Sequence, residues 1–325
     1  MSRSTLTLIT SDIEPAAAAL AQGKLVGFPT ETVYGLGANA LDERAVAKVF
    51  EAKGRPRINP LIVHVAERAD ALRLGVFNGA ARRLAEAFWP GPLTLVVPRS
   101  ADCPVSLLAS AGLDSIAIRM PSHDLARKLI ATAGVPIVAP SANPSGRVSP
   151  TSAAHVLEGL AGRIDMVLDG GDCDIGIEST VVACLAGQPE LVRPGAVTRG
   201  QIEKVLGQSL EMRSEGGRPI APVALASHYA PATAIRLGAA RAEAGEALLG
   251  FGPDVPDHAG PSLNLSPAGD LTEAAANLFA YLRELDASGA KAIAVMPIPA
   301  DGLGEAINDR IARAAAPRGL EGEVS

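Results

Sequence analysis

KGRPRINPL, residues 53–61, holds three basic side chains within five residues, together with two prolines. The prolines prevent a helix from continuing through the stretch. The run that follows, residues 61–65, alternates as a short strand does and leaves one ionisable side chain, His64, on its second face. A basic loop that prolines hold against a strand suits a polyanionic ligand. A solvated basic turn has the same composition, so this stretch alone leaves both interpretations open.

Length and composition favour two α/β domains. The 325 residues are enough for two separate cores. Hydrophobic residues make up 48% of the chain but aromatic residues only 3%, which favours layers built from Ala, Val, Leu and Ile over an aromatic-rich β-sandwich. Cys103, Cys173 and Cys184 lack the spacing of metal ligands, so we expect reduced thiols that are buried as small hydrophobic side chains.

The charge balance argues against generic nucleic-acid binding. The net charge is −6, and residues 1–207 carry equal numbers of basic and acidic side chains with no basic run of five or more. The first ten residues hold too short an apolar run for a signal peptide. No apolar run approaches the roughly 20 residues of a membrane helix. We therefore expect a cytoplasmic protein without membrane contact.

Helix and strand patterns alternate along the first two thirds of the chain, and polar insertions follow the strands. The predicted helices cover residues 14–22, 42–52, 80–88, 124–133, 151–159 and 199–206, with Asp42 and Thr151 as caps; the predicted strands include 24–28, 61–65, 93–97, 115–120, 135–139 and 166–168. Residues 29–37 are predicted to be a loop rich in hydroxyl groups. Because ligands bind at strand ends in open α/β sheets, these insertions are candidate binding loops.

The predicted strand 115–120 carries an arginine among aliphatic residues. Ile116, Ile118 and Met120 share one face, and the other face presents Ser115 and Arg119. Such an arginine is either an exposed charge on an edge strand or a clamp for an anionic ligand. The pattern does not separate the two.

A second, smaller α/β domain follows a linker. Residues 207–232 are rich in glycine and proline, although the pair His228-Tyr229 is unusually specific for a spacer. Beyond them, strands are predicted at 234–237, 247–251 and 292–296, and helices at 270–286 and 303–315. No chemistry can be assigned to this domain.

Five separated motifs together resemble the YrdC/Sua5 family. They are PTETVYGL at 29–36, K-x-R-x-x-x-N-P-L at 53–61, PGPLT at 90–94, SAN-x-SG at 141–146 and ESTV at 178–181. The pair at 228–229 and the second domain resemble the longer Sua5 form. The resemblance implies a YrdC-like twisted open mixed sheet with flanking helices at residues 1–207. It also implies a linker that closes as a lid over the active site at 208–233, and a Rossmann-like C-terminal domain at 234–325.

The same resemblance implies a reaction. The family forms threonylcarbamoyl-AMP and pyrophosphate from L-threonine, bicarbonate and ATP, and the product supplies N6-threonylcarbamoyladenosine at position 37 of tRNA. We expect Mg²⁺ on the ATP phosphates, no metal cage of protein side chains and no organic cofactor. The product would pass to the transferase that modifies tRNA; whether this chain itself contacts tRNA weakly is left open.

The family's binding residues carry over motif by motif. The ATP site takes Lys53, Arg55, Asn59, Ser115, Ser141, Asn143, Ser149, Arg193 and Tyr229; the threonine site takes Thr32, His64, Arg119, the backbone of Ala139, and Ser179. Lys53 and Arg55 are the catalytic candidates, because their charges can stabilise the leaving pyrophosphate. Arg119 can hold the threonine carboxylate with two hydrogen bonds. The linker departs from the family pattern at 221–227, where a basic contact is therefore not expected.

Two other functions are compatible with parts of the sequence. A non-catalytic RNA-binding module would need a segregated basic face, and salt-dependent tRNA binding without threonine-dependent pyrophosphate release would favour it. A carbamoyl-adenylating enzyme with another acceptor, as in hydrogenase maturation, would bring cysteine pairs and an acylphosphatase-like region, and neither is found in the sequence.

Overall fold

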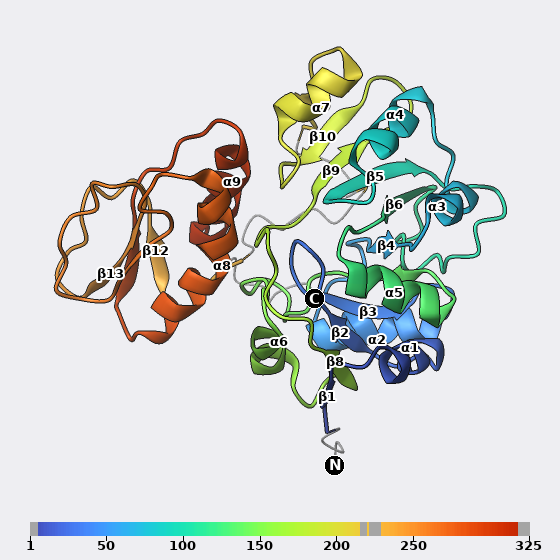
Figure 1. Ribbon diagram of the computed structural model, residues 1–325, viewed down its shortest axis with the longest axis horizontal. Coiled ribbons are helices and arrows are strands. Elements are labelled where there is room, and N and C mark those ends of the chain that lie inside the picture. Colours follow the sequence, from blue (N-terminus) through green and yellow to red (C-terminus); the bar gives the residue numbers. More distant parts are fainter. Residues whose placement is uncertain (1–5, 215–219, 221–228, 318–325) are drawn as a thin grey trace, which may run out of the picture. The chain divides into compact units, whose positions relative to one another are not determined.

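The computed structural model describes residues 6–214, 220 and 229–317. They fall into two compact units: residues 6–144 with 150–214 and 220, and residues 145–149 with 229–317. The helices and strands of each unit carry the labels of Figure 1.

The first unit is a mixed sheet with helices on its faces. Its strands are β1 (Leu8–Thr10), β2 (Val26–Phe28), β3 (Gly35–Asn39), β4 (Ile62–His64), β5 (Leu93–Pro98), β6 (Ser115–Arg119), β7 (Ile137–Val138), β8 (Met166–Leu168), β9 (Thr180–Ala183), β10 (Glu190–Arg193) and β11 (Glu211–Met212). Its helices are α1 (Ile13–Ala21), α2 (Glu43–Lys53), α3 (Arg68–Leu74), α4 (Gly79–Phe88), α5 (Asp124–Ala133), α6 (Ala153–Leu160) and α7 (Arg199–Leu206). The spatial strand order is β1-β8-β2-β3-β7-β4-β6-β5-β9-β10-β11, and parallel and antiparallel pairs both occur.

One face of this sheet is covered by helices only in part. Helices α1 and α5 lie side by side beside β2 and β8 (Figure 1) and bury alanine and leucine side chains against β2, β7 and β8. On the same face, beyond this cover, β4, β5, β6 and β9 carry a small apolar cluster against which Ile220 packs. His64, Thr94 and Arg119 of these strands lie on that face as well, because side chains in a strand point to opposite sides in turn. The fold therefore leaves polar groups next to an apolar patch where the helical layer ends.

Most of the predicted elements are confirmed within one or two residues, and the exceptions have local causes. The loop predicted for 29–37 is wrong at its end, because Gly35 and Gly37 begin β3. A Cβ on Gly37 would lie 2.9 Å from Cε1 of Phe28, so glycine here makes room for the ring of the neighbouring strand. Asp42 caps α2 as predicted and accepts from the Arg44 N–H at 2.9 Å. The cap of α6 is Ser152 rather than Thr151.

The second unit is a small parallel sheet with two helices. Its strands are β12 (Ala234–Arg236), β13 (Glu246–Gly250), β14 (Ser262–Asn264) and β15 (Ala292–Val295), in the order β12-β15-β13-β14, and its helices are α8 (Leu271–Ala287) and α9 (Leu303–Ala315). All three strand pairs are parallel. A parallel sheet with helical connections is the α/β architecture expected for this part of the chain.

The cysteines and the helix lengths bear on two further expectations. All three cysteines are free thiols, and Cys173 and Cys184 are buried. Burial raises the pKa of both buried thiols to about 12, so they stay protonated at neutral pH. No helix in the stretches that the structure covers is long and apolar enough to cross a membrane.

We expect Gly37→Ala to lower the free energy of unfolding by about 1–3 kcal/mol, because the new methyl group would overlap the Phe28 ring. The measurement is the urea midpoint at constant slope. Gly200→Ala is the control: no atom lies within 4 Å of its added Cβ, and alanine favours helix α7 by about 1 kcal/mol. Equal midpoints for the two variants would contradict this explanation of β3.

Candidate active site

The segment between β2 and β3 lies at the centre of the candidate site. Thr30 Oγ1 donates to the Val33 carbonyl at 2.7 Å and lies 2.9 Å from Thr32 Oγ1, which fixes the turn. On one side, the Tyr34 carbonyl accepts from the Ala142 N–H at 2.8 Å, in the SAN motif. On the other side, Thr32 accepts from Arg119. The segment therefore connects motifs that are far apart in the sequence.

Arg119 is a buried cation. It ends β6, between β4 and β5 in the sheet, and only 4% of its surface is exposed. Its Nη1 donates to Thr32 Oγ1 at 2.9 Å, and its Nη2 lies 2.7 Å from Glu31 Oε1. The interpretation of Arg119 as an exposed edge charge is therefore wrong, and a clamp for an anionic group is the alternative that remains.

The strands beside β6 place His64 and Thr94 next to this arginine. Both lie opposite Arg119 in the sheet register, one on β4 and the other on β5. Burial, and then the positive charge of Arg119, lowers the pKa of His64 to about 3, so the imidazole is neutral at physiological pH. Thr94 Oγ1 lies 2.8 Å from Ser179 Oγ, which adds two hydroxyl groups to the same neighbourhood.

Ser179 joins the predicted threonine site to a residue predicted for ATP. Arg193 Nη2 donates to the Ser179 carbonyl at 2.9 Å, and its Nε donates to the same oxygen at 3.2 Å. Gly195 passes so close behind this segment that a Cβ on it would lie 2.5 Å from the Glu178 carbonyl oxygen. The backbone at 178–180 leaves no room for any other residue there, which explains the glycine after Arg193-Pro194.

Lys53 connects two of the motif loops from the inside. It is 3% exposed, and its Nζ donates to the carbonyls of Ser141 and Asn143. Burial, with a smaller effect of the Arg55 charge, lowers the pKa of Lys53 well below its usual range. The interpretation of residue 53 as part of a solvated turn is wrong. Its contact with phosphates stays a prediction, since the described contacts are to carbonyl groups.

Arg55 stiffens the loop that leads into β4. Its Nε donates to the Asn59 carbonyl at 3.3 Å and its Nη2 to the Pro60 carbonyl at 3.1 Å. Arg55 is half-buried and Asn59 is buried, whereas Arg57 is exposed. Of the three cations in the opening stretch, two are therefore held by the fold and one faces the solvent.

Three further predicted residues, Ser115, Ala139 and Ser149, have no described hydrogen bond to Arg119 or Lys53. Ser115 shares the face of Arg119 but lies four residues away, roughly 13 Å along the strand. The Ala139 N–H donates to the Ile62 carbonyl at 3.0 Å, and the contact of its backbone with threonine stays a prediction. Ser149 groups with the second unit and is fully buried.

Tyr229 also belongs to the second unit. Its ring stacks on Phe279 with centroids 5.4 Å apart and lies under the Arg310 guanidinium, and its φ of +63° is unusual for a tyrosine. His228 and residues 221–227 lie outside the described part of the chain. The ATP contacts of Ser149 and Tyr229 and the lid at 208–233 stay predictions.

Two residues of this site were not assigned from the sequence. Glu31 and Thr94 lie inside motifs used for the resemblance, but a single sequence does not show which members of a motif meet in space. The alternation of β5 and β6 could have indicated Thr94, because it places a hydroxyl on the face of Arg119. Nothing in the sequence pattern indicates that Glu31 turns inward.

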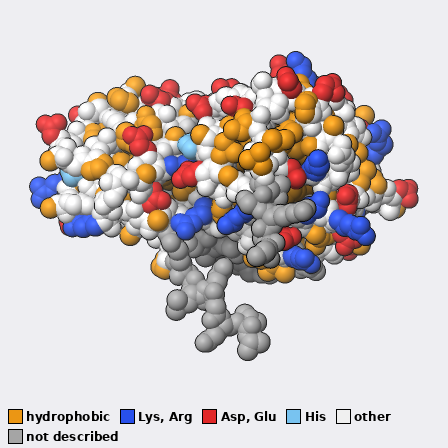
Figure 2. All heavy atoms as spheres, turned by 90° about the horizontal axis from the view of Figure 1, so that it is seen from below, with side chains coloured by type: hydrophobic (Ala, Val, Ile, Leu, Met, Phe, Trp, Pro, Cys, Tyr) orange, Lys and Arg blue, Asp and Glu red, His pale blue; other side chains and the backbone are white. Residues whose placement is uncertain are grey.

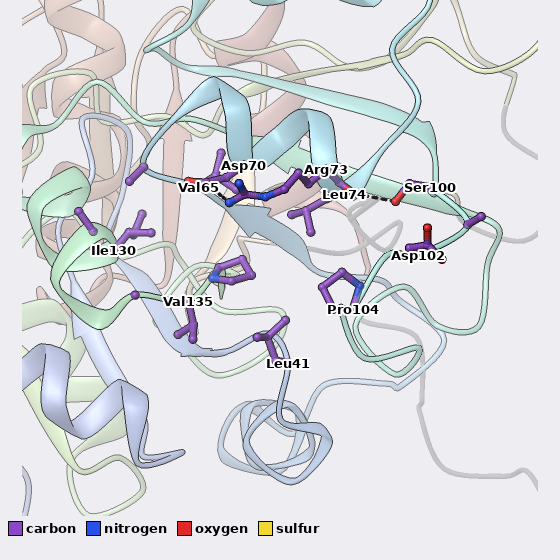
Figure 3. A pocket seen from close by; sticks show the side chains of 15 residues that line it. Leu41, Val65, Asp70, Arg73, Leu74, Ser100, Asp102, Pro104, Ile130 and Val135 are labelled. Carbon is purple, nitrogen blue, oxygen red and sulfur yellow. Dashed lines mark hydrogen bonds and ion pairs between the residues drawn. The ribbon is translucent and has the colours of Figure 1, made fainter.

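A cavity of about 650 Å³ lies elsewhere in the first unit (Figure 3). Its lining is mostly aliphatic, from Val65, Leu74, Ile130 and neighbours, and in its charged pair Asp70–Arg73 the arginine is exposed and the aspartate half-buried. None of the predicted site residues lines it. The buried polar and charged groups around Arg119 can bind a charged substrate, whereas an aliphatic lining offers few such partners. We therefore do not take this cavity as the active site.

The fold and the site define a class of protein: a two-domain α/β protein whose mixed-sheet domain holds buried cations and hydroxyl groups suited to a small carboxylate-bearing ligand. A family model described as "Telomere recombination" (Sua5_yciO_yrdC) matches residues 18–195. A second, described as "Threonylcarbamoyl-AMP synthase, C-terminal domain", matches residues 197–316. The chain belongs to the Sua5/YrdC family, in its two-domain form.

Relatives with known names are similar over nearly the whole chain. The sequence is 42% identical over 320 residues to the threonylcarbamoyl-AMP synthase of Pyrococcus abyssi, with 93% of each chain covered. It is 41% identical over 324 residues to that of Bacillus subtilis, covering 94% of this chain and 93% of the relative. The crystal structure of P. abyssi Sua5 complexed with L-threonine matches with a TM-score of 0.84 at 38% identity, covering 96% of this chain and 97% of that one. The α/β fold with a mixed sheet is confirmed by this similarity.

We expect Lys53→Met to loosen the SAN motif, because two buried carbonyls lose their donor. Hydrogen exchange of the Ala142 amide, which donates to Tyr34, should rise by about 10- to 100-fold, corresponding to about 1–3 kcal/mol. Mass spectrometry of the peptide spanning 139–146 measures it. The control is Lys48→Met, since exposed Lys48 donates to the single carbonyl of Gly23 and should leave that peptide unchanged. Equal protection in both variants would show that Lys53 does not hold the loop.

Proposed function

We propose that this chain is an L-threonylcarbamoyladenylate synthase, which converts L-threonine, bicarbonate and ATP into threonylcarbamoyl-AMP and pyrophosphate. One observation carries the proposal: the buried guanidinium of Arg119 donates to Thr32 and lies opposite Thr94, whose hydroxyl is 2.8 Å from Ser179 Oγ, and these groups suit a small carboxylate. Its support is the similarity to a relative whose structure contains L-threonine. The product supplies the threonylcarbamoyl group of N6-threonylcarbamoyladenosine in tRNA.

The arrangement supports catalysis by positioning and charge. The carbamate oxygen of the substrate attacks the α-phosphorus of ATP, and negative charge grows on the departing pyrophosphate. Arg55 is half-buried in a loop braced by its own hydrogen bonds, so its charge can be aimed at that position before the reaction. No protein nucleophile is needed, and the buried Cys173 thiol, with its pKa raised to about 12, is unsuited to be one.

A metal ion is expected with ATP rather than with the protein. Within residues 6–214, 220 and 229–317, no group of three or more His, Cys, Asp or Glu side chains is placed to hold one. The described residues therefore do not form a dedicated cage, and Mg²⁺ would arrive bound to the phosphates. The contacts that we propose for Arg55 and Arg119 do not depend on the metal ion.

The partners of the reaction are the three small substrates and the transferase that consumes the product. On the face seen in Figure 2, basic and acidic side chains are interspersed. A strong sequence-independent contact with tRNA needs clustered positive charge, so this face favours small-molecule chemistry over the RNA-binding alternative.

We expect the purified chain to incorporate labelled bicarbonate into an adenylate, and to release pyrophosphate, only when L-threonine and ATP are both present. L-Serine, which lacks one methyl group, serves as the control and should react about 10-fold or more slowly. Bicarbonate incorporation that is independent of threonine would reject the proposed acceptor. Salt-dependent tRNA binding without any pyrophosphate release would replace the proposal with the RNA-binding alternative.

We expect Arg55→Ala to lower the rate of pyrophosphate release by about 10²–10³-fold, because a preorganised charge facing the leaving group is lost. Arg57→Ala is the matched control. Its side chain is exposed, and water and salt screen its charge, so the rate should stay within about threefold of the original. Similar rates for the two variants would remove Arg55 from the catalytic role.

A further inference from the structure

Glu31 is a buried carboxylate that neither the sequence motifs nor the proposed reaction assigns. It is 5% exposed and lies in the turn between β2 and β3, next to Thr32. Its Oε1 is 2.7 Å from Arg119 Nη2. Apart from this ion pair and the backbone N–H groups of Glu31 and Ser122 near it, no described donor makes a hydrogen bond of good geometry with its oxygens. Because a buried acceptor without a donor costs free energy, such a group calls for a ligand or another explanation.

The carboxylate is ionised in spite of its burial. Burial alone would raise the pKa of Glu31, but the Arg119 charge, its hydrogen bond and the nearby backbone N–H groups of Glu31 and Ser122 outweigh it and lower the pKa below its usual value. Glu31 and Arg119 thus form a buried ion pair that is neutral as a whole. Such a pair costs more in desolvation than a surface pair and gives stability only when its remaining groups are satisfied.

The arginine of this pair is incompletely satisfied as well. Its Nε is buried and donates to no described residue. Nη1 is committed to Thr32 and Nη2 to Glu31. The ion pair therefore presents an open donor and an open acceptor side by side, both from side chains that are more than nine-tenths buried.

We propose that Glu31 binds the α-ammonium group of the amino-acid substrate while Arg119 binds its carboxylate, so that one ion pair recognises both ends of a zwitterion. The inference rests on the proposed function and deepens it. In an α-amino acid the nitrogen is one carbon away from the carboxylate. A carboxylate held by Arg119 therefore brings the ammonium within reach of a group that lies 2.7 Å from the same guanidinium.

Charge explains why this arrangement selects amino acids. The Glu31–Arg119 pair is neutral and a zwitterion is neutral, so the substrate enters without leaving an unpaired charge in the interior. A hydroxy acid would place its anion beside Glu31 with no ammonium to compensate it, and repulsion then acts against binding. The other titratable groups that interact with the pair, His64 and Cys173, are both uncharged at neutral pH and cannot replace the carboxylate.

The test compares two ligands on two proteins by calorimetry. L-Threonine and (R)-3-hydroxybutanoate share the carboxylate, hydroxyl and methyl groups and differ only in the ammonium. The original chain should bind threonine on the order of 10²-fold more tightly than the hydroxy acid. In Glu31→Gln, threonine affinity should fall on the order of 10²-fold. The hydroxy acid should bind as before or more tightly, so the preference disappears.

Glu246→Gln is the control variant. Glu246 is also 5% exposed and pairs with an arginine, Arg236, but in the second unit, so its loss should leave both affinities unchanged. A Glu31→Gln protein that loses both ligands equally would overturn the inference, because it would show that Glu31 only supports Arg119. Unchanged threonine affinity would overturn it too.

Two further measurements keep the inference testable if Glu31→Gln does not fold. The original chain alone must prefer threonine to the hydroxy acid, and equal binding of the two would overturn the inference. Glu31→Asp, which keeps the charge on a shorter arm, should retain part of the preference. Threonine-dependent pyrophosphate release by the original chain tests the proposed function separately, so the two can fail independently.

Discussion

The burial of the Arg119 guanidinium is the constraint that shapes the site. An arginine cannot shed its proton inside a protein, so its charge has to be compensated where it lies. Strand β6 places it between two other strands, where water has little access. The side chains around it provide the compensation as a hydroxyl from Thr32, a carboxylate from Glu31 and a neutral ring from His64. A site of this kind is preorganised, because the polar groups are held in place before any ligand arrives.

The segment 29–36 connects Arg119 to other parts of the first unit through hydrogen bonds. It follows β2, reaches Arg119 through Thr32, and contacts the SAN motif through Tyr34 and Gly35. Lys53 stabilises the SAN motif by donating to two of its carbonyl groups, those of Ser141 and Asn143. Three motifs that are more than a hundred residues apart at their extremes are thus joined by backbone and side-chain hydrogen bonds rather than by strand pairing alone. Displacement of one loop would therefore affect the others.

The sequence predicted the regular elements well and the special contacts poorly. Helices α5, α7 and α9 were predicted at their observed bounds, because apolar periodicity and the glycine or proline that follows each helix are local signals. Strand β3 was missed, since its glycines are explained only by the Phe28 ring on the neighbouring strand. The alternation of β6 placed Arg119 on the right face but could not show that it was buried. The inward turns of Lys53 and Glu31 depend on partners about 90 residues away, and no local pattern encodes them.

Arg119 and Lys53 are both buried basic residues, but they have different partners, and the chemistry of the two side chains explains the difference. A guanidinium group presents its donors in a fixed planar arrangement, which suits a residue that binds a carboxylate. Lys53 lies where burial lowers its pKa well below the usual range, and an amine can satisfy two carbonyls whether or not it carries the third proton. A lysine can therefore support the loop without imposing a permanent charge on the interior, whereas an arginine there would need a carboxylate of its own. The carboxylate of Glu31 accordingly lies beside the guanidinium of Arg119, at 2.7 Å.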